Sequence, residues 1–199
     1  MLKVDKGSIP QPLQDIHKDK GIRIWEDLSK TKISLKRRHD LRNEMLVKEQ
    51  SGYCVYCERN IVDLEKESSI EHIKPRSKFP SLIFDYDNMV VSCQSRTSCT
   101  QIKDDQWDAL FIHPVLDDPC LYFDYDMESG EVIPKRGLDS YSQSRAVKTI
   151  EILNLNEWKL KGARKTLVLQ MRHIQKNEDK EFENFQKFPS LIQTYRDSL

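Results

Sequence analysis

The chain has 199 residues, enough to bury one sizeable core or a small core with added helices. Lys and Arg together number 32, as do Asp and Glu, which excludes a protein that attracts polyanions through its overall charge alone. No apolar run approaches the roughly 20 residues that span a bilayer, and the N-terminus lacks the apolar segment of a signal peptide. We therefore expect a cytoplasmic protein with no membrane partner.

Residues 1–20 contain two prolines and lack helical periodicity, so we expect an extended arm there. Apolar residues at helical spacing predict one helix over 22–30 and a second over 34–50, with Ser34 as the N-cap of the second. Residues 30–48 carry seven basic side chains against two acidic ones, and we expect the basic ones to face outward. Such a block forms a solvated face or contacts nucleic acid.

The central segment predicts two strands and a helix. In residues 68–73, Ile70 and His72 alternate with Glu71 and Ile73 as the two faces of a strand would. Residues 88–92 form a second β-rich run. Pro75 and Pro80 interrupt the connection between them. A polar run that begins at Thr100 predicts a helix after the second strand.

The last part of the chain predicts a β-hairpin and two helices. The hairpin strands are expected over 121–126 and 131–134, and the first helix over 141–153. A longer helix over 157–176 is expected to be capped by Asn156. The first helix is expected to place Val147, Ile150 and Leu153 on one side. The stripe of the second helix, which predicts core packing or a partner surface, consists of Leu160, Arg164, Leu167, Met171 and Ile174.

Four cysteines form a split pattern typical of a zinc site. The pair Cys54-x-x-Cys57 is separated by a long loop from Cys93 and Cys99, and thiolates at such spacings can close a tetrahedral Zn²⁺ site. Buried free thiols are the alternative, and the wide gap before Cys99 makes it the least typical ligand. Cys120 lies outside the pattern and is expected to be an ordinary half-buried thiol.

The loop between the cysteine pairs encloses a carboxylate, an imidazole and an amide, on Glu71, His72 and Asn88. Adjacent Glu and His occur often by chance, and a lone His more often makes structural hydrogen bonds. The position of this pair on a predicted strand inside a zinc loop, followed by residues 73–75, resembles the HNH endonucleases. Three further segments resemble the PtuB-like HNH component of Septu anti-phage systems, some of which accompany retrons: residues 6–10, 54–58 and 149–156.

The resemblance implies an α+β fold with a zinc-clamped ββα-metal (HNH) core. Residues 1–50 would form the N-terminal arm and helices, residues 51–112 the core, and residues 113–199 a hairpin and a helical C-terminal extension. Within the core, His72 would take a proton from water, and Glu71 would bind a catalytic Mg²⁺ or Mn²⁺ ion. The same resemblance gives Asn88 the role of bracing the loop between the strands.

One position departs from the family pattern. Family members place His or Asn directly after the last cysteine, three residues before a lysine, whereas this chain has Thr100 before Lys103. Threonine is a poor metal ligand, so Gln101, Asp104 or a water molecule remain candidates for the third ligand of the catalytic ion.

The function that the resemblance implies is hydrolysis of DNA in a bacterial anti-phage defence system. The implied partner is an ABC/SMC-like (PtuA-like) ATPase, and the basic helix over 157–176 is a candidate surface for attaching the ATPase or DNA. Two alternatives stay open from the residues alone. One is a zinc-stabilised adaptor without catalytic activity, and the other is an HNH nuclease that cleaves RNA.

Overall fold

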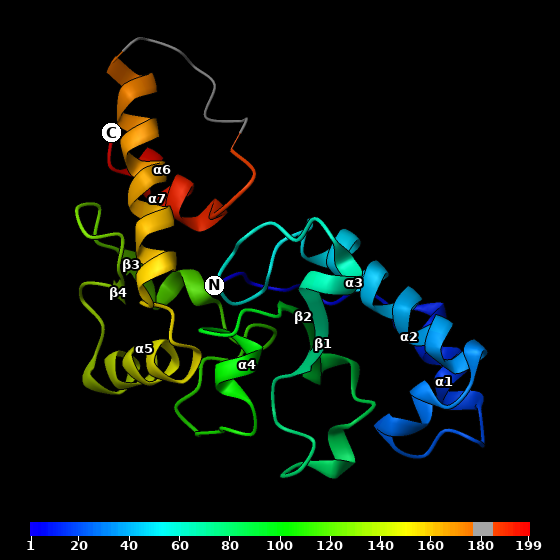
Figure 1. Cartoon of the computed structure of the whole chain (residues 1–199). Coiled ribbons are helices and arrows are strands. Elements are labelled where there is room, and N and C mark those ends of the chain that lie inside the picture. The colour runs from blue at the N-terminus through cyan, green and yellow to red at the C-terminus, as the bar shows by residue number, and fades with distance from the viewer. Residues whose placement is uncertain (177–184) are drawn as a thin grey trace.

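The computed structural model describes residues 1–176 and 185–199. It combines helices with two small antiparallel sheets, which confirms the α+β class (Figure 1). In the central sheet, β1 (Ser68–His72) pairs with β2 (Met89–Cys93), as expected within one residue at each end. In the view of Figure 1, this pair stands between α4 on one side and the α1–α2 pair on the other.

The first helix contradicts the expected extended arm. Pro12 lies in its first turn, where the missing backbone N–H of proline removes no intrahelical bond, and Leu13 and Ile16 bury the apolar face. The N-terminal elements are α1 (Gln11–Lys18), the 3₁₀ turn η1 (Trp25–Ser29), α2 (Lys32–Glu44) and its π-helical continuation η2 (Met45–Glu49).

The N-cap of α2 is Thr31, not the expected Ser34. The Thr31 hydroxyl accepts the backbone N–H of Ser34 at 3.0 Å, and the Ser34 hydroxyl accepts the N–H of Thr31 at 3.2 Å. These reciprocal bonds satisfy two donors that a helix start would otherwise leave unpaired. The helix therefore begins about one turn earlier than the pattern indicated.

Short elements precede, connect and follow the central strands. The helix expected from Thr100 ends at Lys103, because Asp104 adopts a positive φ of 42° that interrupts the helix. These elements are α3 (Leu64–Glu67), the 3₁₀ turns η3 (Pro80–Leu82) and η4 (Tyr86–Asn88), and α4 (Thr100–Lys103).

The C-terminal part contains the expected hairpin and two expected helices, together with a further helix, α7. The buried face of the first helix is offset from the expected one, since Val147 is 40% exposed while Ala146 and Thr149 are buried. The elements are η5 (Pro119–Leu121), β3 (Phe123–Tyr125), β4 (Val132–Pro134), α5 (Ser140–Leu153), α6 (Trp158–Lys176) and α7 (Pro189–Asp197).

The expected N-cap of α6 is also wrong. The Asn156 side chain instead pairs with the backbone of Val132, accepting its N–H at 2.8 Å and donating to its carbonyl at 2.9 Å. The carboxylate of Glu157 caps the helix by accepting the N–H groups of Lys159 and Leu160, both at 3.0 Å. Asn156 thus attaches the start of α6 to the hairpin.

Buried apolar side chains from all three expected segments belong to one cluster, as Leu13, Val91 and Leu167 illustrate. The division into residues 1–50, 51–112 and 113–199 stays a prediction. Within the part of the chain that the structure describes, no helix has both the length and the apolar character needed to cross a membrane.

Candidate active site and metal centre

The four cysteines that the sequence predicts as zinc ligands lie close together in the interior of the protein. One Sγ atom from each of Cys54, Cys57, Cys93 and Cys99 lies within 4.8 Å of the other three. The Cys54–Cys99 and Cys57–Cys93 Sγ distances are 3.9 and 3.7 Å. Four Zn–S bonds of about 2.3 Å in a tetrahedron separate the sulfur atoms by about 3.8 Å, so the cluster fits zinc.

Neighbouring groups orient these thiols. The backbone N–H of Cys93 donates to Cys54 Sγ at 3.3 Å, and the Arg59 guanidinium lies 3.8 Å from Cys93 Sγ. Donors of this kind stabilise the thiolates that a metal requires. Cys99, with a positive φ of 59°, donates its backbone N–H to Leu153 O at 2.9 Å, which connects the cluster to α5. Outside the cluster, Cys120 is exposed rather than half-buried.

Glu71 forms a buried ion pair with Lys103. Its Oε1 lies 2.7 Å from Lys103 Nζ, and the same ammonium donates to the His72 carbonyl at 3.1 Å. Burial raises the pKa of Glu71, and the charge of Lys103 opposes that rise. The pair joins β1 to α4, the helix that follows Cys99.

His72 is a neutral base in this environment. Its Nε2–H donates to the Ile83 carbonyl at 2.9 Å, so the lone pair of the neutral ring is on Nδ1. Its ring lies edge-on to Trp25, with the centroids 4.5 Å apart. Burial lowers the pKa of His72 to about 4. The imidazole is therefore unprotonated at neutral pH, which is the form in which a general base acts.

Asn88 closes the loop between the two strands. Its Oδ1 accepts the backbone N–H of Lys74 at 2.8 Å, while its Nδ2 donates to the carbonyls of Lys74 and Leu82 at 3.1 and 3.2 Å. An amide supplies both a donor and an acceptor, which a carboxylate at this position could not do. The geometry suits the bracing role that the family resemblance implies, and that role stays a prediction.

A divalent cation at Glu71 does not fit the residues as they stand. The Lys103 ammonium already contacts that carboxylate at 2.7 Å, and the Thr100 hydroxyl beside it is a second donor to the same group. In residues 1–176 and 185–199, the cysteine cluster is the only group of three or more His, Cys, Asp or Glu side chains placed to hold a metal. The expectation of Mg²⁺ or Mn²⁺ at Glu71, with Gln101, Asp104 or a water molecule in place of Thr100 as the third ligand, stays a prediction.

A pocket of about 490 Å³ opens beside Glu71 and His72. Its wall includes Arg38 and Arg42 of α2, which contradicts the expectation that the basic side chains of this helix all face outward. The only feature of the sequence that could have indicated this placement is the i, i+4 spacing of the two arginines, which puts them on one face of a helix. The other residues of the wall are Trp25, Ser69, Ile70, Pro75, Arg76, Gln94, Thr100, Gln101, Asp104 and Asp105.

No protein-family model matches the chain. Over 115 residues it is 24% identical to Septu protein PtuB of Bacillus thuringiensis. The aligned region covers 56% of this chain and 40% of that protein, so the chain spans well under half of this curated relative. The similarity agrees with the resemblance to PtuB-like proteins.

Proposed function

We propose that the chain is an HNH endonuclease that hydrolyses phosphodiester bonds in DNA, as the nuclease effector of a Septu-type anti-phage defence system. The observation that carries the proposal is that Glu71 and a neutral His72, adjacent on β1, both lie in the wall of an open pocket, and that the partner strand ends at Cys93 of the cysteine cluster. The similarity to a PtuB protein supports the defence role.

In the proposed reaction, His72 Nδ1 takes a proton from a water molecule as the water oxygen forms a bond to phosphorus. The bond from phosphorus to the leaving oxygen then breaks, and that oxygen takes a proton from solvent. A general base of this kind contributes roughly 10²–10⁴-fold to the rate. The Ile83 carbonyl fixes the tautomer by accepting the Nε2 proton, and Lys103 holds the backbone of His72.

Zinc at the four cysteines has a structural role in this proposal, because all four ligand positions are filled by protein and none is left for water. The cluster fixes the end of β2 through Cys93 and the start of α4 through Cys99. The family resemblance also implies Mg²⁺ or Mn²⁺ in catalysis. The proposed reaction does not depend on such an ion, and the cleavage assay is run with Mg²⁺, with Mn²⁺ and with neither.

The proposed partner is an ABC/SMC-like ATPase that restrains or targets the nuclease. The support is the similarity to Septu protein PtuB and the neutral net charge, because a nuclease delivered by a partner needs little basic surface of its own. Co-expression of the chain with the ATPase from its own genome, followed by affinity purification, tests the pairing. Recovery of the chain without the ATPase contradicts it.

The activity is tested on supercoiled plasmid and on total RNA, with Mg²⁺, Mn²⁺ or neither, and with or without the ATPase. We expect plasmid nicking that falls roughly 10²–10⁴-fold in His72→Ala while the zinc content is unchanged. His39→Ala is the matched control, because His39 lies on α2 and does not line the pocket. Zinc content and thermal unfolding show whether each variant is folded.

The other outcomes select the alternatives. RNA cleavage that His72→Ala abolishes would replace DNA by RNA as the substrate. A folded, zinc-loaded parent that cleaves neither substrate, even with the ATPase present, would favour the zinc-stabilised adaptor. Equal cleavage by the parent and His72→Ala would place the active site elsewhere.

A further inference from the structure

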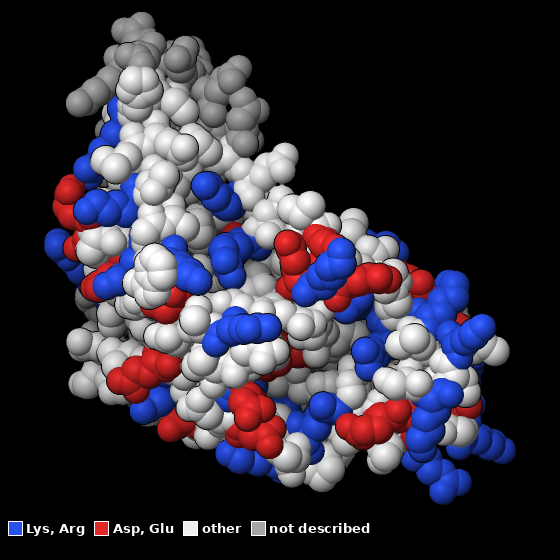
Figure 2. All heavy atoms as spheres, viewed as in Figure 1, with Lys and Arg blue, Asp and Glu red and all other residues white. Residues whose placement is uncertain are grey.

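Two arginines on α2 share the pocket with His72. Arg38 and Arg42 are four residues apart, so their side chains project from the same face of the helix into one pocket wall. In Figure 2, basic side chains gather over the α1–α2 side of the molecule, with acidic ones among them. Their helix precedes the predicted core over residues 51–112, so the family resemblance assigns them no role.

Four neighbouring basic side chains already have counter-ions. By contrast, within the described part of the chain no carboxylate oxygen lies at ion-pair distance from Arg38 or Arg42. Arg38 donates to the Ser29 hydroxyl and Arg42 to the Ser68 carbonyl, each at 3.0 Å. The neutralised pairs are Lys30–Asp27 (2.6 Å), Lys36–Asp40 (2.6 Å), Arg37–Asp19 (2.7 Å) and Lys48–Glu44 (2.8 Å).

One hydrogen-bond donor of Arg42 is unsatisfied. Its Nε is buried and has no hydrogen-bond partner within residues 1–176 and 185–199. Burial, reinforced by the nearby charge of Arg38, lowers the pKa of Arg42, and the charge of Glu65 opposes this shift only in part. Two guanidinium groups that repel one another and carry unused donors form a site that an anion would stabilise.

We propose that Arg38 and Arg42 bind phosphate groups of a nucleic-acid strand and hold it along the α2 side of the pocket, next to His72. The inference rests on the proposed nuclease function for the identity of the strand. A guanidinium matches the geometry of a phosphate with two parallel hydrogen bonds. Asp104 and Asp105 in the same wall repel phosphate, so the strand lies toward the arginines.

Contacts of this kind read the backbone and not the bases. The site therefore accepts phosphodiesters without regard to sequence, and it positions the strand without taking part in the bond breaking. DNA and RNA share this chemistry, so the site by itself favours neither. Binding through it should weaken steeply with salt, because each neutralised phosphate releases counterions.

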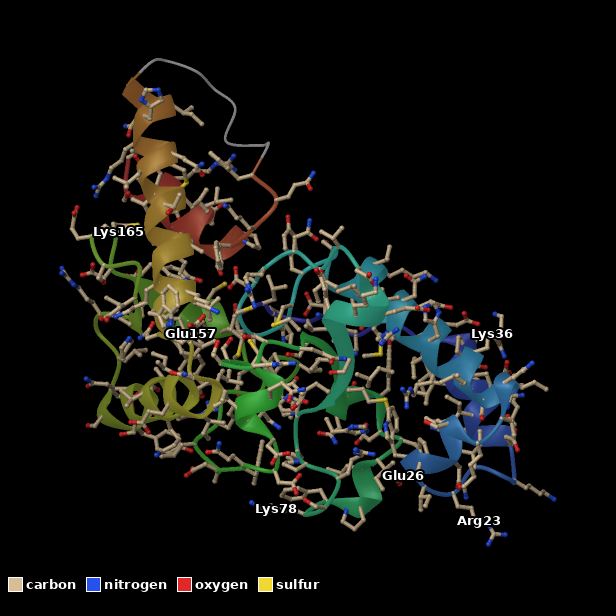
Figure 3. The ribbon with its side chains drawn as sticks, in the orientation of Figure 1. Arg23, Glu26, Lys36, Lys78, Glu157 and Lys165 are labelled. Atoms are coloured by element: carbon tan, nitrogen blue, oxygen red, sulfur yellow. The ribbon has the colours of Figure 1, made fainter. Side chains whose placement is uncertain are left out.

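The test measures binding of fluorescein-labelled DNA and RNA oligonucleotides by fluorescence anisotropy over a range of salt concentrations. All proteins carry His72→Ala, so that no substrate is cleaved. Arg38→Gln/Arg42→Gln is compared with Lys32→Gln/Lys36→Gln, which removes the same charge from the same helix outside the pocket. Lys36 lies on the side of α2 that faces away from β1 and β2 (Figure 3).

We expect the arginine variant to lose about tenfold in affinity for each arginine, and the slope of log K against log salt to fall by about 0.7–0.9 for each contact. The lysine variant should lose no more than about twofold, because neither lysine lines the pocket that holds His72 and Lys36 is already paired with Asp40. Arg42 also bonds to Ser68 in β1, so Arg38→Gln alone decides the matter if the double variant loses zinc or unfolds.

Equal binding by the arginine and lysine variants, or no binding of either oligonucleotide by the protein with both arginines, would overturn the site. Cleavage by chains with an intact His72 separates this result from the fate of the nuclease. If binding depends on the arginines but no cleavage occurs, the phosphate site is supported and the nuclease function is contradicted. If the arginine variant cleaves and binds as well as the parent, the nuclease function is supported and the phosphate site is contradicted.

Discussion

The Oε1 atom of Glu71 lies 2.7 Å from the Nζ atom of Lys103, and the Lys103 side chain is fully buried. Because Lys103 also donates to the His72 carbonyl, one ammonium holds both candidate catalytic residues. The helix that carries Lys103 begins directly after Cys99. The cysteine cluster, α4 and the two candidate catalytic residues are therefore directly connected.

Lys103→Met should destabilise the protein by about 3–5 kcal/mol, because it leaves the Glu71 carboxylate buried without its counter-ion. Urea denaturation of the zinc-loaded protein measures the loss. Lys148→Met is the control, since Lys148 pairs with Glu151 on the exposed surface of α5 at 2.9 Å. That control should change the free energy of unfolding by no more than about 1 kcal/mol. An equal loss in both variants would show that the buried ion pair contributes no more to stability than the exposed one.

Cys57→Ser should abolish zinc binding and cooperative folding, because structural zinc in small sites contributes on the order of 10 kcal/mol to the folded state. Elemental analysis of the parent should give about one zinc per chain, as a four-thiolate site requires. Cys120→Ser removes the exposed cysteine and should keep both the zinc and the unfolding transition. A parent that is folded and free of zinc would contradict the assignment.

The sequence predicted those parts of the site that depend on the spacing of residues within a short segment of the chain. The cysteine spacings indicated the cluster, and the β-rich run over 88–92 indicated a strand that leads to Cys93. The partner of Glu71 was not predictable in this way, because Lys103 reaches it only when α4 folds against β1. Arg38 and Arg42 were missed for the same reason, since periodicity assigned their helix no neighbour on that face.

Long-range pairing also changes the interpretation of α6. Its basic side chains suggested a surface for a partner or DNA, but Lys161 pairs with Glu131 at 2.9 Å and Arg172 with Glu128 at 2.6 Å. Arg164 is buried and donates to the Leu155 carbonyl at 2.9 Å. Acidic residues of the β3–β4 hairpin thus account for part of the basic charge, and the charge count alone no longer favours attachment through this helix.

Gly130→Ala should separate the hairpin from α6. A Cβ atom at this position would lie 2.4 Å from the Lys161 carbonyl oxygen, so the two backbones would have to move apart. Gly137→Ala is the matched control, because it has a similar positive φ of 84° but no atom within 4 Å of the added Cβ. Both variants carry a backbone strain of about 1 kcal/mol, and thermal unfolding should show a much larger loss for Gly130→Ala alone. Similar losses in the two variants would show that the hairpin can move away from α6 with little loss of stability.

His113→Asn should make the protein less sensitive to acid. His113 Nδ1 accepts the backbone N–H groups of Val115 and Leu116, both at 3.3 Å, and burial lowers the pKa of His113 to about 4 from the ordinary 6.5. The unfolded chain therefore binds a proton before the folded chain does. The contribution of His113 to stability is complete above pH 6.5 and is lost as the pH falls toward 4.

The size of that loss is at most about 1.4 kcal/mol for each pH unit in this window. An asparagine amide oxygen can accept the same two N–H groups without titrating, so the variant keeps the loop while losing the proton linkage. Urea denaturation at a series of pH values between 7 and 4.5 measures both proteins, and the free energy of unfolding of the parent should fall more steeply. Parallel curves would mean that His113 titrates alike in the folded and unfolded chains.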